Sequence, residues 1–359
     1  MLQDFVYLTG GLVILLICGD LLVRGATSLA ARYGVSPLLI ALTIVAFGTS
    51  APELLVSVRA ALAGVPGIAL GNVVGSNIAN ILLILGLPAL IYPIACAGRI
   101  MPHNMLIMMA ASVTLIALCF IGPLGFWQGL FLLTLLAIYL VYSGWDARMN
   151  PHEPSPLLAS ADDVLPVPEH LGDPFAQDAS FDAARSLPHG DLPPPLHSRR
   201  VIALKIVLGI AGLPLGARLV VDGGIDIAQV FGVSDAVIGL SLIAVGTSLP
   251  ELATSVMAVF RRNDEMVVGN IVGSNIMNIL AILGITALIA PLPIDKDFLT
   301  FHLWVMLGAA VLLLPMAMTG HKIGRIAGAV FLLCYGAYLY AMFAFGHVPP
   351  TVENGLNGF

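Results

Sequence analysis

Apolar residues run almost without interruption along this chain, in stretches long enough for helices that cross a lipid bilayer. A bilayer core requires roughly 20 consecutive apolar residues per helix. Short polar turns separate ten such stretches, at about 5–30, 36–61, 68–92, 103–121, 126–143, 201–230, 234–259, 266–290, 299–318 and 323–345. The pattern therefore predicts an all-α polytopic membrane protein with ten transmembrane helices.

One long polar segment, residues 144–199, interrupts this pattern. It holds 9 of the 21 acidic residues and 10 of the 24 prolines. Such a composition is typical of a tether without a packed core. A regulatory cation-binding role is the alternative, although the acids lack the spacing of an EF-hand. We therefore expect three parts: five helices in 1–143, a Pro-rich acidic loop in 144–199, and five helices with a C-terminal tail in 200–359.

Composition and charge exclude several classes of protein. Of the 359 residues, 58% are hydrophobic and 10% are charged, whereas a soluble domain has about 25% charged residues. The net charge of −6 comes largely from the polar loop, and without a basic patch we expect no nucleic-acid partner. The four cysteines (Cys18, Cys96, Cys119, Cys334) form no CxxC motif, so neither a disulfide framework nor a zinc site is indicated.

The basic residues predict the orientation in the membrane, because Lys and Arg accumulate in cytoplasmic loops. With the N-terminus outside, eleven of the fifteen Lys and Arg residues lie on the cytoplasmic side and only Arg59 and Lys296 lie outside. We therefore expect both termini outside the cell (inner) membrane and the 144–199 loop in the cytoplasm. Two of the remaining charges, Arg24 and Arg218, lie within spans, four residues from Asp20 and Asp222, where we expect intrahelical ion pairs. His103 and His302 begin corresponding spans and are expected at the interface.

Two motifs occur twice at one constant spacing. GTSAPELLVSV from Gly48 matches GTSLPELATSV from Gly246, and GNVVGSNIANILLILG from Gly71 matches GNIVGSNIMNILAILG from Gly269. Both pairs are separated by 198 positions. Since each repeat has five predicted spans, an odd number, the second repeat enters the membrane from the opposite side. Inverted repeats are typical of secondary transporters, whose substrate sites lie near the membrane midplane between the repeats.

The repeated motifs place a carboxylate in the middle of an apolar span. Glu53 and Glu251 have no Lys or Arg within one helical turn. Intramembrane carboxylates usually mark an ion or proton pathway. A buried, protonated Glu bonded to a neighbouring helix is the structural alternative, but it would have to arise twice. Pro52 and Pro250 lack an N–H, so we expect each helix to be disrupted there, which exposes carbonyls to a cavity.

Oxygen donors surround both carboxylates in the sequence. Thr49 and Ser50 share a helical face with Glu53, and Asn72, Ser76 and Asn80 follow in the next helix at spacings of four. The second repeat matches Ser76 and Asn80 with Ser274 and Asn278. Calcium takes 6–8 hard oxygen ligands and sodium accepts similar ones, whereas zinc and copper prefer thiolate and imidazole. The glycines of GNxxG are equally explained by close helix packing.

These paired GTSxPE and GNxxGSNxxN segments resemble the alpha repeats of the cation/calcium exchanger superfamily, above all its YrbG-like bacterial branch and the archaeal sodium/calcium exchangers. The resemblance covers nearly all of the chain outside the 144–199 loop. It implies ten helices and alternating access, with sodium and calcium competing for one central cluster. Mapped onto this chain, the family's ligands fall on Glu53, Glu251, Ser76, Ser274, Asn80, on hydroxyls or carbonyls of Thr49, Ser50, Thr247 and Ser248, and on the carbonyls of Ala46 and Ala244.

One position departs from that pattern, since the archaeal exchangers carry an Asp where this chain has Asn278. The stoichiometry and the coupling ion therefore stay open, with calcium/proton or potassium-dependent exchange as the alternatives to calcium/sodium exchange. An intramembrane hydrolase is disfavoured because the motif spans contain no His, so we expect no enzyme and no cofactor. A passive channel is disfavoured because conduction requires weaker binding than a cage of many ligands provides.

Overall fold

The computed structural model describes residues 2–64, 67–96, 101–149, 198–230 and 244–344. This part of the chain is almost entirely helical and contains eight helices long and apolar enough to cross a membrane. They are Gln3–Tyr33, Gly67–Ile91, Met101–Ile121, Phe126–Asp146, Arg199–Ile225, Asp264–Ile289, Phe298–Thr319 and Arg325–Met342. The prediction of an all-α polytopic membrane protein is confirmed. The expected span 234–259 and the 144–199 loop lie partly outside the described residues.

The first half of the chain places a broken helix between two long ones. Its elements are α1 (Leu2–Tyr33), α2 (Pro37–Ile40), η1 (Ala41–Val45), α3 (Ala46–Thr49), α4 (Ala51–Leu62), α5 (Gly67–Ala79), η2 (Asn80–Leu85), α6 (Gly86–Ile91), β1 (Ile94–Ala95), α7 (Met101–Ile121) and α8 (Phe126–Met149). The α2–α4 segment bends by 43° where α3 meets α4, and with that bend it would form a ninth span. The two η elements are π-helical turns, which frequently occur at functional sites.

The second half follows a similar order. Its elements are α10 (Arg199–Val230), α12 (Ala244–Thr247), α13 (Leu249–Phe260), α14 (Asp264–Met277), η5 (Asn278–Ile282), α15 (Leu283–Ile289), η6 (Phe298–His302), α16 (Leu303–Thr319), β2 (Lys322–Ile323) and α17 (Arg325–Ala344). The short strands β1 and β2 pair antiparallel. The GNxxGSNxxN helices, α5–η2–α6 and α14–η5–α15, are the most buried of the eight spans, so the repeated motifs lie at the centre of the molecule.

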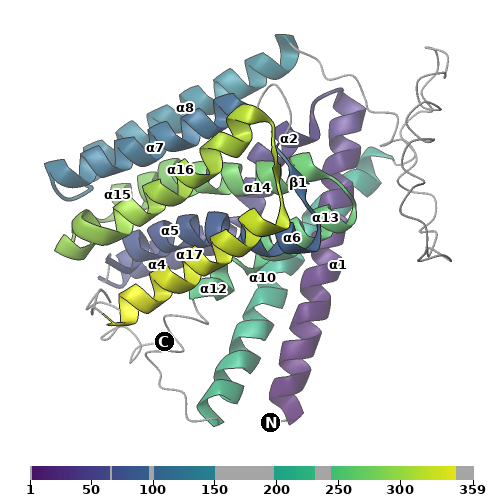
Figure 1. Ribbon diagram of the computed structural model, residues 1–359, viewed down its shortest axis with the longest axis horizontal. Helices are drawn as coiled ribbons and strands as arrows, with labels where there is room; N and C mark the ends of the chain where they lie inside the picture. Colours follow the sequence, from purple (N-terminus) through teal and green to yellow (C-terminus); the bar gives the residue numbers. More distant parts are fainter. Residues whose placement is uncertain (1, 65–66, 97–100, 150–197, 231–243, 345–359) are drawn as a thin grey trace.

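Helices α1 and α10 lie side by side and antiparallel, and extend together beyond the other helices (Figure 1). Glycines allow their backbones to approach closely. A Cβ atom on Gly11 would lie 2.8 Å from the carbonyl oxygen of Gly216, and one on Gly216 would lie 3.0 Å from that of Gly11. In the centre, Gly273 of α14 packs in the same way, because a Cβ there would lie 2.6 Å from the carbonyl oxygen of Leu42 in η1.

The helix breaks occur just before the two prolines, as the sequence predicts. Helix α3 ends at Thr49, Ser50 leaves the helical conformation with ψ 5°, and Pro52 lies in the first turn of α4. The second repeat has the same break at Ser248, with φ −92° and ψ 5°, followed by Pro250 in the first turn of α13. A proline is tolerated in a first turn because the N–H it lacks has no intrahelical partner there.

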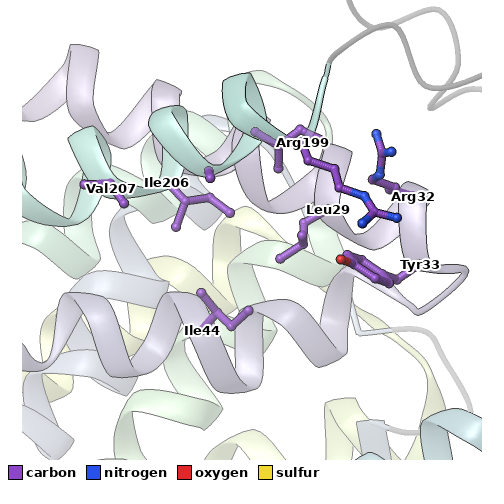
Figure 2. A pocket seen from close by; sticks show the side chains of 9 residues that line it. Leu29, Arg32, Tyr33, Ile44, Arg199, Ile206 and Val207 are labelled. Carbon is purple, nitrogen blue, oxygen red and sulfur yellow. The ribbon is translucent and has the colours of Figure 1, made fainter.

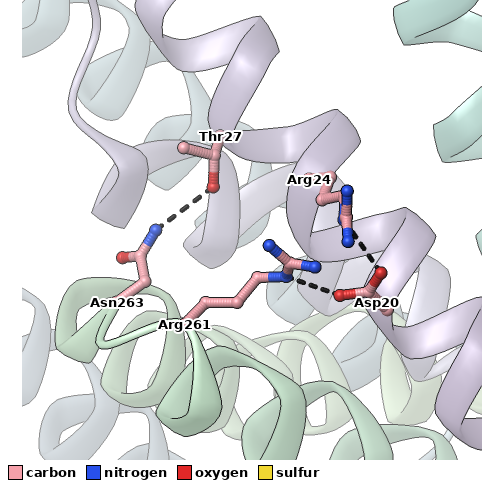
Figure 3. Close-up of polar contacts among 5 residues, drawn as sticks. All are labelled: Asp20, Arg24, Thr27, Arg261 and Asn263. Carbon is pink, nitrogen blue, oxygen red and sulfur yellow. Dashed lines mark hydrogen bonds and ion pairs between the residues drawn. The ribbon is translucent and has the colours of Figure 1, made fainter. Parts of the chain in front are cut away.

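A polar segment, residues 261–265, comprises the turn after α13 and the first two residues of α14, and it connects these helices to α1 (Figure 3). Asp20 of α1 accepts hydrogen bonds from Arg24 Nε at 2.9 Å and from Arg261 Nε. Asn263 Nδ2 donates to Thr27 Oγ1 at 3.1 Å. The expected Asp20–Arg24 ion pair is confirmed, as is Arg218–Asp222 at 3.5 Å. The link from Asp20 to Arg261, 241 positions away, is not apparent from the sequence.

The same 261–265 segment also holds α2 and β1. The Asp264 carboxylate accepts the backbone N–H of Ala95 at 2.9 Å, and the Glu265 carboxylate accepts that of Leu38 at 3.3 Å. The Arg262 guanidinium lies 5.5 Å from the centre of the Tyr92 ring. Arg262 has a left-handed backbone, with φ 52°, and the residue 198 positions earlier, Gly64, also has positive φ at 78°. The second repeat therefore keeps the turn of the first but replaces its glycine with a side chain that contacts a neighbour.

The expectation that His302 lies at a membrane interface stays a prediction, because burial inside the protein does not fix the depth of a residue in the bilayer. His302 is buried, and its Nδ1 lies 3.1 Å from the Tyr338 hydroxyl. Its ring contacts those of Phe298 and Phe301 in the same helical turn, with ring centres 5.1 and 5.2 Å away. Hydropathy at the start of the span does not reveal this burial, because the Tyr338 hydroxyl comes from α17, 36 positions along the chain. His103, by contrast, is exposed.

Candidate ion-binding site

The two repeated carboxylates lie directly after the two helix breaks. Glu53 and Glu251 are each the third residue of their helix, α4 and α13. Both side chains are completely buried, with 0% exposure. The first turn of a helix is favourable for a negative charge because its backbone N–H groups carry partial positive charge. The breaks at Ser50 and Ser248 therefore create the two helix starts that accommodate these carboxylates in the interior of the helix bundle.

Each helix break contacts the carboxylate of the opposite repeat. Ser50 Oγ donates to Glu251 Oε1 at 3.2 Å, and Ser248 Oγ donates to Glu53 Oε1 at 3.3 Å. The two bonds are equivalent under the 198-residue spacing of the repeat. The carboxylates therefore belong to one cluster, in which residues from both repeats alternate.

Further hydroxyls extend the cluster into the next helices. Ser274 Oγ donates to Glu251 Oε1 at 3.4 Å, and Ser248 Oγ lies 3.4 Å from Ser76 Oγ. Thr49 Oγ1 lies 3.4 Å from Ser274 Oγ. The structure thus brings together five of the predicted hydroxyl residues with both carboxylates: Thr49, Ser50, Ser76, Ser248 and Ser274.

Four asparagines cross between the two central helices. Asn80 Nδ2 donates to Asn275 Oδ1 at 3.0 Å, and Asn278 Nδ2 donates to Asn77 Oδ1, also at 3.0 Å. Asn77 and Asn275 also donate to each other's backbone carbonyls at 3.4 Å. Sequence reasoning missed Asn77 and Asn275, although both lie within GNxxGSNxxN. These bonds orient the amides of Asn80 and Asn278 so that each uses its nitrogen and leaves its oxygen available.

Four buried oxygens in this cluster have no hydrogen-bond partner among the described residues. They are Glu53 Oε2, Glu251 Oε2, Asn80 Oδ1 and Asn278 Oδ1. Only two other side-chain atoms in the described part of the chain share this property, on Ser255 and Asp264. A buried acceptor without a donor costs free energy and therefore requires an explanation. Bound cations would satisfy these four oxygens, since carboxylate and amide oxygens are ligands for hard cations.

A second layer of asparagines holds the backbone behind each carboxylate. Asn72 Nδ2 donates to the Glu53 carbonyl and to Ser57 Oγ, both at 3.1 Å. In the second repeat, Asn270 Nδ2 donates to Thr254 Oγ1 at 2.9 Å. Thr254 Oγ1 in turn donates to the Glu251 carbonyl at 2.9 Å. These bonds fix the first turns of α4 and α13 against the central helices.

The other predicted ligands are placed less completely. The Ala46 carbonyl accepts from the Ser50 N–H at 3.0 Å and from Thr49 Oγ1 at 3.3 Å, so it lies beside the cluster. Ala244 and Thr247 are the first and last residues of α12, next to the undescribed residues 231–243, and their part in the cluster stays a prediction. Among the described residues, no group of three or more His, Cys, Asp or Glu could hold a metal ion, so the cluster depends on hydroxyl and amide oxygens beside its two carboxylates.

Comparisons with known proteins match nearly the whole chain to one family and one fold. The family described as sodium/calcium exchanger protein matches residues 4–145 and 201–344. The inner membrane protein YrbG of Escherichia coli is 35% identical over 285 residues, covering 79% of each chain. The sodium/calcium exchanger MaX1 of Methanosarcina acetivorans is 33% identical over 370 residues, covering 95% of this chain and 98% of the relative. A solved structure of the sodium-calcium exchanger NCX_Mj, soaked with Na⁺ and Sr²⁺, aligns with a TM-score of 0.73 and 30% identity, covering 95% of this chain and 98% of that one.

Proposed function

This chain belongs to the sodium/calcium exchanger protein family, and from that premise we propose that it exchanges calcium for sodium at the cluster around Glu53 and Glu251. The family relation makes it a cation antiporter. The identity of the ions and the site are our proposal. The observation that carries it is the set of four unpartnered buried oxygens, two from each repeat and all on predicted ligands.

The ligand chemistry fits a hard cation. Carboxylate, amide and hydroxyl oxygens of both repeats meet in one buried cluster. Calcium accepts 6–8 such ligands in a flexible arrangement. Each glutamate uses Oε1 to accept a serine hydroxyl and keeps Oε2 available, so the serines orient the carboxylates without occupying all their lone pairs.

The charge of the cluster fits the same ions. Two buried carboxylates bring a charge of −2, and neither of them takes part in the ion pairs found among the described residues. Buried charges without partners are very costly. One calcium ion or two sodium ions would neutralise the pair by simple charge count, so the two ions would compete for one set of ligands.

Alternating access follows from the proposed inverted arrangement of two five-helix repeats. Each repeat contributes one broken helix whose serine contacts the carboxylate of the other repeat. A rearrangement of one repeat against the other would expose the shared cluster first to one side of the membrane and then to the other. The ten-helix count is part of this proposal.

The experiment that tests the proposal is calcium flux in proteoliposomes containing the purified full-length chain. Imposed sodium, potassium and proton gradients are compared side by side at equal membrane potential. We expect the sodium gradient to drive calcium against its own gradient. Calcium movement that responds only to the proton gradient would replace sodium with protons as the counter-ion, and the absence of flux under all three gradients would contradict exchange of calcium.

A further inference from the structure

A groove on the outside of the helix bundle is not used by the proposed exchange. It has a volume of about 370 Å³ and lies between the end of α1, η1 and the beginning of α10. Figure 2 shows the guanidinium groups of Arg32 and Arg199 at one end, above the Tyr33 ring. Ile206 and Val207 of α10 extend toward the other end. The groove is therefore cationic at one end and aliphatic along its length.

The position of the groove relative to the membrane is given by the two helices that border it. Tyr33 ends α1, and Arg199 begins α10, so both guanidinium groups lie at the same end of two antiparallel membrane-spanning helices. Val207, two turns into α10, has 60% of its surface exposed. Arginines at helix ends lie at the level of lipid headgroups, and exposed aliphatic side chains further along face the acyl chains.

We propose that this groove binds an anionic phospholipid, with the phosphate between Arg32 and Arg199 and one acyl chain along Ile44 and Val207. A planar guanidinium forms paired hydrogen bonds to phosphate oxygens. None of the nine described residues that line the groove is acidic, so nothing in the lining opposes a negative headgroup. The distribution of Lys and Arg predicts that this end faces the cytoplasm, where anionic lipids favour basic pockets between transmembrane helices.

The size of the groove agrees with a lipid rather than with a free anion. Its volume lies at the lower end of the range for small-molecule sites, about 300–1,000 Å³. A phosphate ion alone would leave the aliphatic part uncovered, whereas a phospholipid matches both parts in the order in which they occur. The proposal concerns a surface separate from the ion cluster and does not depend on which ions are exchanged.

The test compares lipid binding by variants that lose the same charge at different places. Purified full-length protein is titrated with phosphatidylglycerol and with phosphatidylcholine, and bound lipid is counted by native mass spectrometry. One double variant is Arg32→Gln with Arg199→Gln. The matched control is Arg200→Gln with Arg325→Gln, since both arginines are exposed in the first turns of their helices and do not line the groove.

We expect the parent protein and the control to prefer phosphatidylglycerol, and the Arg32/Arg199 variant to lose about tenfold of that preference. Glycerol phosphate, which has the headgroup charge but no acyl chain, should not compete. An equal loss of the preference for phosphatidylglycerol in both double variants would show that basic surface residues attract anionic lipid without a specific site, and would overturn the proposal. Competition by glycerol phosphate would overturn it in favour of a free-anion site, and a parent without any preference would leave the groove to another occupant, such as the chain's own acidic loop.

Discussion

The contact between Asp20 and Arg261 should control how firmly the 261–265 segment closes against α1. This segment holds α1 through Asp20 and β1 through Asp264. Because residues 261–265 are consecutive, we expect the segment to move as one unit. Replacing Arg261 with Gln removes the charged bond to α1 and should increase the opening of the whole segment. Cys96, which directly follows β1 and is 2% exposed, provides a natural probe of that opening.

The magnitude follows from the burial of the pair. A hydrogen bond between charged groups contributes about 1.5–3 kcal/mol. Side-chain exposures of 25% for Arg261 and 20% for Asp20, together with the remaining Arg24 partner, favour the lower end of that range. A loss of about 1.4 kcal/mol corresponds to a tenfold change in the opening equilibrium. We therefore expect roughly tenfold more open segment in Arg261→Gln and a similar increase in Asp20→Asn.

The assay is alkylation of Cys96 by a maleimide, followed by mass spectrometry of the labelled peptide. Burial, with a contribution from the charge of Asp264, raises the pKa of the Cys96 thiol to about 12. Only the thiolate reacts, so the closed form is nearly inert at neutral pH, and labelling reports the open form, in which the thiol titrates near its usual pKa of about 8.5. The labelling rate should therefore rise with pH as that thiol loses its proton. Buried Cys119 is an internal control.

A double-mutant cycle decides whether the effect comes from the Asp20–Arg261 bond itself. If the two residues act through that bond, Cys96 in the double variant Asp20→Asn with Arg261→Gln is alkylated no faster than in either single variant. Arg218→Gln is the matched control, because it breaks an exposed Arg–Asp pair elsewhere and should leave Cys96 labelling unchanged. Additive rate increases, or single variants that label at the parent rate, would refute the reasoning.

Two further predictions concern the polar loop and the amide cluster. Deletion of residues 150–197 should leave calcium flux within about twofold of the parent, because the loop contributes no repeated motif; a folded deletion variant without flux would contradict the tether interpretation. Asn278→Asp should make calcium flux more dependent on pH, since only a protonated carboxyl can replace the donor that Asn278 supplies to Asn77 Oδ1 at 3.0 Å. Flux profiles against pH that superimpose on those of the parent would place Asn278 outside the ion cluster.

The repeat explains why so much of the site can be predicted from the sequence. Two copies of a motif at a constant spacing indicate which residues must be equivalent, and hydropathy indicates that they lie inside the membrane. Glu53 and Glu251 therefore emerge without any structure, and Pro52 and Pro250 indicate the helix breaks. The same equivalence predicts that Ser50 and Ser248 make matching contacts. The sequence does not show that each serine donates to the glutamate of the other repeat.

The parts that the sequence could not predict depend on contacts between helices. In the sequence, Asn77 looks like an ordinary polar residue of its helix. Its role appears only when η5 packs against α5 and brings Asn278 Nδ2 within 3.0 Å of Asn77 Oδ1. From the sequence, Arg261 is expected to be a charged residue of a cytoplasmic loop. Its bond to Asp20 depends on how α1 packs against this segment. The π-helical turns that begin at Asn80 and Asn278 leave no mark in hydropathy, because their side chains are as apolar as those of the flanking α-helices.

The most direct test of the central claim is calcium binding to the purified protein, measured by titration calorimetry with and without competing sodium. Glu53→Gln and Glu251→Gln each remove one of the two buried charges, and Asp222→Asn removes the same charge from an exposed position of α10. We predict that sodium-sensitive calcium binding is lost in both Gln variants while they remain folded by circular dichroism, and that it is retained in Asp222→Asn. Parent-level calcium binding in either folded Gln variant would contradict the assignment of the ion site to these two carboxylates.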